Sequence, residues 1–134
     1  MNKFRDIAKK SLFLVGLMVC GVAGAHHSPA AYDITTRTSK TGVIQDVSFR
    51  NPHGHITLLV TNEKGQIEEW SVEMSAANLL RRRGWEFSQV VPNLKVTVMG
   101  HLNKEVPRDI YIREIKLPDG TVFGDKGGND NALD

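Results

Sequence analysis

The sequence predicts an all-β protein: a small OB-fold-like β-barrel of five strands with one short helix between strands three and four. Three observations lead to this prediction. Apolar and polar residues alternate in short segments, as half-buried strands require. Turn residues such as Asn, Pro, Asp and Gly separate these segments. One helical segment follows the third strand, which is the element order of an OB-fold, and closing the sheet would remove exposed strand edges.

The first three strands are expected between Thr41 and Met74. Asn51-Pro52 interrupts the pattern after the first strand, because proline lacks a backbone donor. The loop 62–65 ends in glycine and is typical of a hairpin. Along the third strand one parity is apolar, so we expect that face to be buried. The first expected strand begins at Thr41, and the next two span 55–61 and 66–74. The apolar face of the third strand carries Glu68, Trp70, Val72 and Met74.

The helix is expected over residues 75–84. Ser75 is a favourable N-cap, and Gly84 suits the left-handed conformation that ends a helix. The run Arg81–Arg83 complements the negative end of the helix dipole. We interpret this run as a solvated helix face rather than as a nucleic-acid contact.

The remaining strands are expected over residues 93–102 and around 110–116, with a short edge strand at 121–123. The alternation slips by one residue between Ile112 and Ile115, which predicts a β-bulge. From Gly124 the chain is rich in Gly, Asn and Asp and has almost nothing to bury, so a disordered tail is expected over 124–134.

Residues 1–25 have the features of a cleavable signal peptide. A basic start precedes the apolar run 12–22, and Ala23-Gly24-Ala25 matches the small-residue cleavage pattern. The apolar run is shorter than the roughly 20 residues that span a bilayer, which disfavours an uncleaved anchor and stable membrane insertion. A lipoprotein would need a small residue before Cys20, where Val19 stands. We therefore expect a bacterial periplasmic or secreted protein cut after Ala25, with an arm over 26–40 and the barrel over 41–123.

Cleavage changes the charge and the chemistry available. The leader removes Lys3, Arg5, Lys9, Lys10 and Asp6 from 17 basic and 15 acidic residues, which leaves 13 and 14 and a net charge near −1. Such a domain lacks the basic field that nucleic-acid binding requires. The single cysteine also leaves with the leader. Disulfides, a thiol nucleophile and a cysteine–zinc site are thereby excluded from the mature chain.

The five histidines are the candidate ligands. His26-His27 would begin the mature chain. An N-terminal histidine can chelate a metal through its α-amine and its ring, and a second imidazole completes the T-shaped arrangement called a histidine brace. These nitrogen donors favour copper(II). The sequence therefore predicts His26 as a copper ligand, with His27 beside it.

The second histidine group, His53 and His55, could supply the further nitrogen. In an extended chain residues two apart point to the same side. Gly54 between them would let a ligand or partner chain approach closely. The competing interpretation is that these are ordinary polar histidines at an arm and a strand start. His101 shares its parity with Met99, for which an exposed strand face is expected rather than a copper(I) site.

No catalytic motif is apparent. The carboxylates are scattered, no serine has a nucleophile motif, and no glycine-rich phosphate loop is present. Trp70 and Trp85 are expected in the core or at its rim rather than as a stacking platform for sugars or bases. We therefore expect a protein that is not an enzyme.

Several segments together resemble a bacterial family of short secreted proteins classed as a domain of unknown function. The resemblance covers about residues 25–124 and brings no established activity, substrate or cofactor. It implies an exported β-barrel module, with any cleft among His26, His27 and the Asn51-Pro52-His53 motif. The segments that carry it are Ala25-His26-His27-Ser28, Asn51-Pro52-His53, Glu69-Trp70-Ser71-Val72-Glu73, Leu79-Leu80-Arg81-Arg82-Arg83-Gly84-Trp85 and Leu117-Pro118-Asp119-Gly120.

Three functional classes follow. The first is an exported binding module with copper(II) as ligand, through His26, His27, His53 and His55. The second is a metal-free interaction module for a protein of the cell envelope. The third is a copper-dependent oxidative enzyme, which would need an open coordination position and a substrate surface. An OB-fold binder of oligosaccharide or peptide is a further form of the binding module. The sequence leaves the oligomeric state open.

Overall fold

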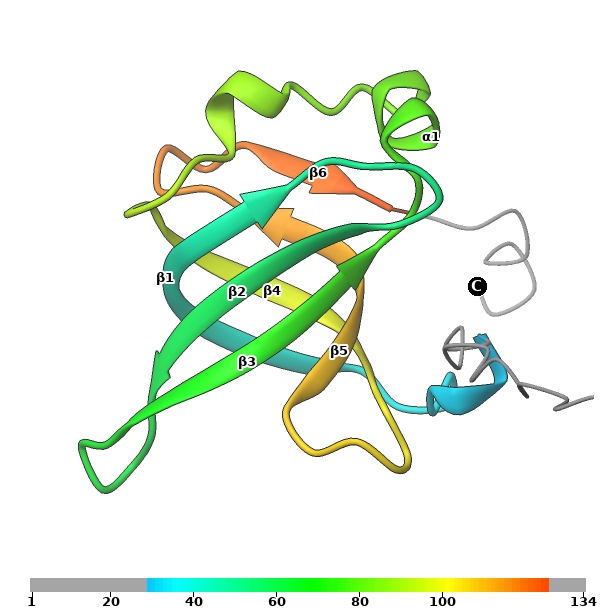
Figure 1. Ribbon diagram of the computed structural model, residues 1–134. Coiled ribbons are helices and arrows are strands. Elements are labelled where there is room, and N and C mark those ends of the chain that lie inside the picture. The colour runs from blue at the N-terminus through cyan, green and yellow to red at the C-terminus, as the bar shows by residue number, and fades with distance from the viewer. Residues whose placement is uncertain (1–28, 126–134) are drawn as a thin grey trace, which may run out of the picture.

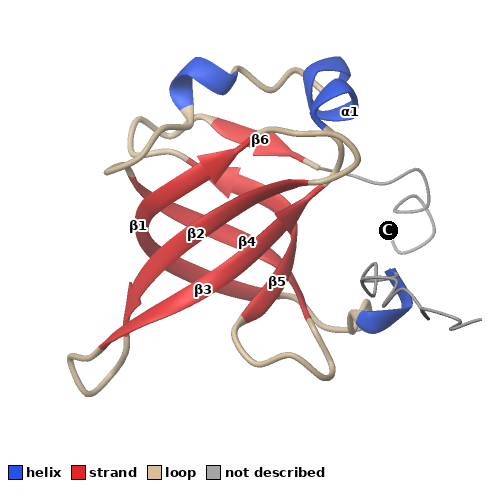
Figure 2. Cartoon of the chain, in the orientation of Figure 1, coloured by secondary structure: helices blue, strands red, loops and turns tan. Residues whose placement is uncertain are grey.

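The computed structural model describes residues 29–125 of the 134-residue chain. About half of this part is β-strand, and it forms a closed five-stranded barrel with one short α-helix, as the sequence predicted. Figures 1 and 2 show that α1 and the 3-10 helix η2 lie across one end of the barrel. The elements are η1 (Pro29–Ala31), β1 (Thr38–Ser48), β2 (Gly54–Thr61), β3 (Ile67–Met74), α1 (Ala77–Arg82), η2 (Phe87–Gln89), β4 (Lys95–Leu102), β5 (Asp109–Lys116) and β6 (Val122–Gly124).

The sheet follows the order β3-β2-β1-β4-β5-β6, and β3 also pairs with β5. All sequential neighbours are antiparallel, whereas the β3–β5 contact that closes the barrel is parallel. This closing contact has three residue pairs: Ser71 with Asp109, Val72 with Ile110 and Glu73 with Tyr111. Barrel closure therefore places the carboxyl-terminal half of β3 beside the start of β5.

The core fills the barrel with apolar side chains from every barrel strand. The predicted buried face of β3 is confirmed, since Trp70, Val72 and Met74 are all buried. Leu80 projects from α1 into the end of the barrel and is fully buried. Trp85 is buried as well and packs on Phe123, with ring centroids 5.5 Å apart. Both tryptophans therefore belong to the core, and burial of such large side chains supplies much of the stabilisation.

Two bulges adjust the register of the barrel. The bulge predicted between Ile112 and Ile115 is confirmed: Gly100 pairs with Ile112, and its neighbour Met99 pairs with Glu114, so that Arg113 is left over. A second shift lies between Ile44 and Asp46 in β1. A bulge bends and twists the strand that carries it, which helps a short sheet to close.

The first strand and the helix differ from the prediction at their ends. β1 begins at Thr38, inside the expected arm, because its first residues pair with β4. The prediction of Ser75 as N-cap is wrong: Ala76 holds that position and no side chain caps the helix. The backbone N–H of Ser75 instead donates to the Asp125 carboxylate at 2.8 Å. Gly84 does adopt the positive φ that was expected.

Asp125, the residue directly after β6, is held by buried polar contacts. This carboxylate is fully buried and forms an ion pair with Arg83. Arg83 is therefore not part of a solvated face, which corrects the interpretation of the arginine run for that residue. The expectation of a disordered tail over 124–134 is wrong for its first two residues, because Gly124 ends β6 and Asp125 is fully buried; the rest of that range lies outside the described residues. Between residues 29 and 125 no helix is long and apolar enough to cross a membrane.

Candidate functional site

The histidines of the second group lie on the outer surface of the barrel, at the start of β2. His53 ends the β1–β2 loop and its side chain is 45% exposed. His55 is the second residue of β2 and is partly exposed. The first group, His26 and His27, lies outside the described residues, so the brace remains a prediction.

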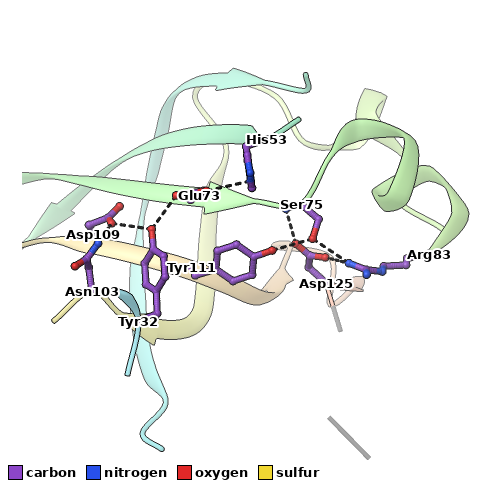
Figure 3. Close-up of polar contacts among 9 residues, drawn as sticks. All are labelled: Tyr32, His53, Glu73, Ser75, Arg83, Asn103, Asp109, Tyr111 and Asp125. Carbon is purple, nitrogen blue, oxygen red and sulfur yellow. Dashed lines mark hydrogen bonds and ion pairs between the residues drawn. The ribbon is translucent and has the colours of Figure 1, made fainter. Parts of the chain in front are cut away.

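The ring of His53 is oriented by a carboxylate from the neighbouring strand. Nδ1 of His53 lies 3.0 Å from Oε1 of Glu73, a largely buried residue near the end of β3 (Figure 3). A neutral imidazole that donates its Nδ1 hydrogen to a carboxylate carries its lone pair on Nε2. This carboxylate–imidazole arrangement is the usual support of metal-binding histidines, because it fixes the ring and raises its basicity.

His55 also has a partner on β3. Its Nε2 atom lies 3.2 Å from the Ser71 hydroxyl, and its backbone position is opposite Glu73. Both histidines thus contact β3 residues of one parity, as expected for side chains that point to one side. Within the described part of the chain, no group of three or more His, Cys, Asp or Glu residues is arranged to hold a metal ion.

Glu73 is also the contact point of the N-terminal arm. The hydroxyl of Tyr32 lies 2.8 Å from Oε2 of Glu73 and 2.9 Å from Oδ2 of Asp109 (Figure 3). Tyr32 is 2% exposed. Burial, together with these two acceptors, raises the pKa of Tyr32 far above its usual value, so the phenol remains a hydrogen donor. The two oxygens of Glu73 therefore contact two separate segments, the arm and the β1–β2 loop.

Asp109 is held in place from the β4–β5 loop. The amide nitrogen of Asn103 donates to Oδ2 of Asp109 at 2.9 Å, and Asp109 is buried. The Asn103 side-chain oxygen accepts the backbone N–H groups of Glu105 and Val106, which fixes the loop itself. The backbone of Asn103 pairs with Tyr32 in an isolated bridge. Tyr32 thus docks the arm through both its backbone and its side chain.

A second polar cluster adjoins the first at the end of β3. The hydroxyls of Ser75 and Tyr111 are 3.0 Å apart, and Arg83 donates to the Ser75 oxygen and to Asp125 (Figure 3). The rings of Tyr111 and Tyr32 are in contact, with centroids 5.4 Å apart. Burial raises the pKa of Tyr111. This cluster ties the end of β6 to the helix, and it borders the Tyr32 contact without bonding to Glu73.

Two expectations about single residues are wrong. His101 is not on an exposed face: it is 4% exposed, and its Nδ1 atom lies 2.7 Å from the Thr36 carbonyl, because the arm covers this part of β4. Gly54 does not open space for a ligand. A Cβ at this position would lie 3.1 Å from Cε of Met74 and 3.2 Å from the Ser48 carbonyl, so the close approach is within the barrel itself.

Sequence patterns had not singled out Tyr32, Glu73 and Asp109 as a group. Tyr32 is the sole Phe, Tyr or Trp in the arm 26–40, and an isolated aromatic in a polar arm is a signal for docking on the domain. Asp109 is the first residue of β5, and it becomes a signal only once the pairing of β3 with β5 is known. Two surface hollows lie elsewhere. One, of about 440 Å³, is lined by Leu94 and Leu117, and the other, of about 530 Å³, lies at the β2–β3 turn.

A family comparison covers most of this site. The profile of a family of unknown function, DUF6152, matches residues 15–109. The chain belongs to DUF6152. The matched range includes the arm, His53, Glu73 and Asp109, and it ends at the first residue of β5. No curated protein matches the chain significantly.

Proposed function

We propose that this DUF6152 chain is an exported, non-enzymatic binding module that holds copper(II) between an N-terminal His26 and His53. The observation that carries the proposal is the position of Glu73. One of its oxygens accepts from His53, and the other accepts from Tyr32, six residues after His26. The carboxylate thus brings the arm to the histidine that it orients.

The chemistry of His53 suits a ligand. Its Nδ1 atom is engaged by Glu73, and about half of its side chain is open to solvent. The Nε2 atom then carries the free lone pair that a metal needs. Imidazole and amine nitrogens favour copper(II) among the divalent first-row metals, since copper(II) heads their affinity order.

The reach of the arm is sufficient. An extended chain spans at most about 3.3–3.6 Å per residue, so the six steps from Tyr32 to His26 cover up to about 20 Å. The hydroxyl of Tyr32 and the ring of His53 contact opposite oxygens of one carboxylate, so the side chain of Tyr32 ends close to His53. His27 and His55 are the candidates for an additional nitrogen. His55 uses Nε2 for its contact with Ser71, so it would offer Nδ1.

The decisive test uses protein that has been exported and processed in its own way. Intact mass gives the first residue, and titration calorimetry with copper(II), together with competition by zinc(II), gives affinity and selectivity. We expect a mature start at His26, submicromolar copper binding, and loss of that binding in His26→Ala and in His53→Ala. A form that retains an extra Met before His26 is the matched control, because it keeps both rings but displaces the amine.

Other results would overturn the proposal. A mature start elsewhere excludes the brace. Micromolar or weaker binding that His26→Ala leaves unchanged excludes copper as the ligand. In that case a partner captured from the periplasm equally with and without chelator would identify the chain as a metal-free interaction module of the envelope. Peroxide-dependent turnover that a chelator abolishes and copper restores would assign it to the oxidative enzymes instead.

A further inference from the structure

The end of the barrel that α1 and η2 cover carries a surface of aromatic and cationic side chains (Figures 1 and 2). It consists of Phe49, Arg50, Arg81 and Phe87, and we call it the arginine–phenylalanine surface. We propose that this surface docks an acidic peptide segment of a partner protein. The inference does not depend on copper binding, because none of the four residues is a proposed metal ligand.

A stacked pair of phenylalanine rings forms the apolar part of the surface. Phe49 directly follows β1, and Phe87 is the first residue of η2. Their rings are parallel, with centroids 3.8 Å apart, and both side chains are only partly buried. Phe49 also meets the buried ring of Trp85 edge-on, with centroids 6.4 Å apart. The pair is therefore backed by the core and leaves apolar area in contact with solvent.

The guanidinium group of Arg81 lies over this ring pair. Arg81 is exposed in the last turn of α1, and its Cζ atom is 5.0 Å from the centroid of the Phe87 ring. A cation–π contact of this kind orients the guanidinium and leaves the N–H groups at its edge available. Among residues 29–125 no carboxylate forms an ion pair with Arg81, whereas Arg83 is paired with Asp125. Arg81 therefore presents an oriented, unneutralised charge.

The β1–β2 loop adds a second guanidinium beside the rings. The Arg50 carbonyl accepts the Ala77 N–H at 3.0 Å, and Oδ1 of Asn51 accepts the Asn78 N–H at 3.3 Å. These bonds fix the loop to the start of the helix that carries Arg81. The Arg50 side chain is exposed, and it too has no ion-pair partner in the described part of the chain. Two fixed elements thus present two free cations at one apolar patch.

The chemistry of the surface fits a carboxylate-bearing peptide. Guanidinium groups match carboxylates in a bidentate geometry, and arginine and aromatic residues are the types that dominate protein interfaces. A segment with Asp or Glu beside an apolar residue would satisfy both parts of the surface. An anionic membrane fits less well, because such binding typically uses clusters of about 4–8 Lys or Arg. Here the neighbouring Arg82 brings the number of exposed arginines to three, and the exposed Glu86 adjoins Phe87.

The test selects phage-displayed random 12-residue peptides on the full chain and measures their binding by fluorescence anisotropy. We expect the selected peptides to be rich in Asp and Glu next to an apolar residue. Arg81→Gln and Arg50→Gln should each weaken their binding about fivefold to tenfold, since a charge-assisted pair that is partly buried on binding contributes more than a fully exposed one. Arg37→Gln is the matched control. Arg37 is also exposed, but it precedes β1, whereas Arg50 follows the other end of that strand.

Several outcomes would overturn the inference. Selection of no peptide, or of peptides without acidic residues, excludes an acidic partner. Acidic peptides that bind Arg81→Gln and Arg50→Gln as tightly as the wild type exclude this surface. An equal loss in Arg37→Gln would indicate general charge attraction. Binding to phosphatidylglycerol vesicles without binding to the peptides would assign the surface to lipid instead. If circular dichroism shows that Arg81→Gln is unfolded, Arg50→Gln decides alone by the same criteria.

Discussion

Replacing Arg83 by Met should destabilise the fold more than any other single change in the arginine run. Asp125 is fully buried, and its carboxylate has Arg83 and the Ser75 amide as partners. The Arg83 side chain is 26% exposed. Removing one partner of a buried ion pair costs about 3–5 kcal/mol because the other charge is left uncompensated. The remaining amide bond and the partial exposure of Arg83 place the expected loss at the lower end, about 3 kcal/mol.

Urea unfolding measures this loss. For a domain of this size the denaturant slope is about 1–3 kcal/mol per molar, so the midpoint should fall by about 1–3 M with the slope unchanged. Arg82→Met is the control, since Arg82 is the adjacent residue and is exposed, and surface changes are usually within about 0.5 kcal/mol. Asp125→Asn in the Arg83→Met background should recover part of the loss. A loss below about 1 kcal/mol in Arg83→Met, or one equal to that in Arg82→Met, would refute the stabilising role assigned to the Arg83–Asp125 pair.

Two further predictions concern the barrel and its response to alkali. Gly100→Ala should lower the free energy of unfolding by at least about 2 kcal/mol, since the new Cβ would lie 2.2 Å from the Tyr111 carbonyl oxygen. An unchanged midpoint of thermal unfolding would contradict this prediction. The raised pKa of Tyr32 means that the unfolded chain loses its phenolic proton above pH about 10 while the folded chain retains it. The free energy of unfolding should therefore be unaffected by this group below pH 10 and fall above it, by about 1.4 kcal/mol per pH unit. Urea titrations between about pH 9 and 11 should show a shallower fall in Tyr32→Phe, and identical slopes in the two proteins would exclude the effect.

The barrel could be predicted because its signals are local. The alternation along β3 identified Trp70, Val72 and Met74 as the buried face, and the slip between Ile112 and Ile115 identified the bulge in β5. The position of the helix after the third strand then favoured the OB-fold order. Errors arose where tertiary contacts override local preference.

Ser75 and His101 show how such overrides act. Ser75 has the composition of an N-cap, but its amide donates to Asp125, 50 positions away. His101 has the parity of an exposed residue, but the arm covers it through the Thr36 carbonyl. Neither Asp125 nor Thr36 can be identified as a partner from the local sequence of the helix or of β4.

The candidate site was only half visible from the sequence for the same reason. The common side of His53 and His55 follows from a spacing of two residues, which is a local property. The contact of Tyr32 with Asp109 joins positions 77 apart, and its contact with Glu73 joins positions 41 apart. These contacts depend on closure of the barrel between β3 and β5, and no periodic pattern encodes that closure.

The three residue pairs that close the barrel have a consequence for when the site comes into existence. Glu73 belongs to one of these pairs and Asp109 to another, so the arm has no acceptor pair to dock on until β3 and β5 have met. An intermediate with both halves of the sheet folded but unjoined would offer isolated imidazoles and no organised coordination. A ligand that requires the joined form adds its binding free energy to the global unfolding equilibrium. A ligand of that kind would therefore bind only molecules in which β3 and β5 have joined.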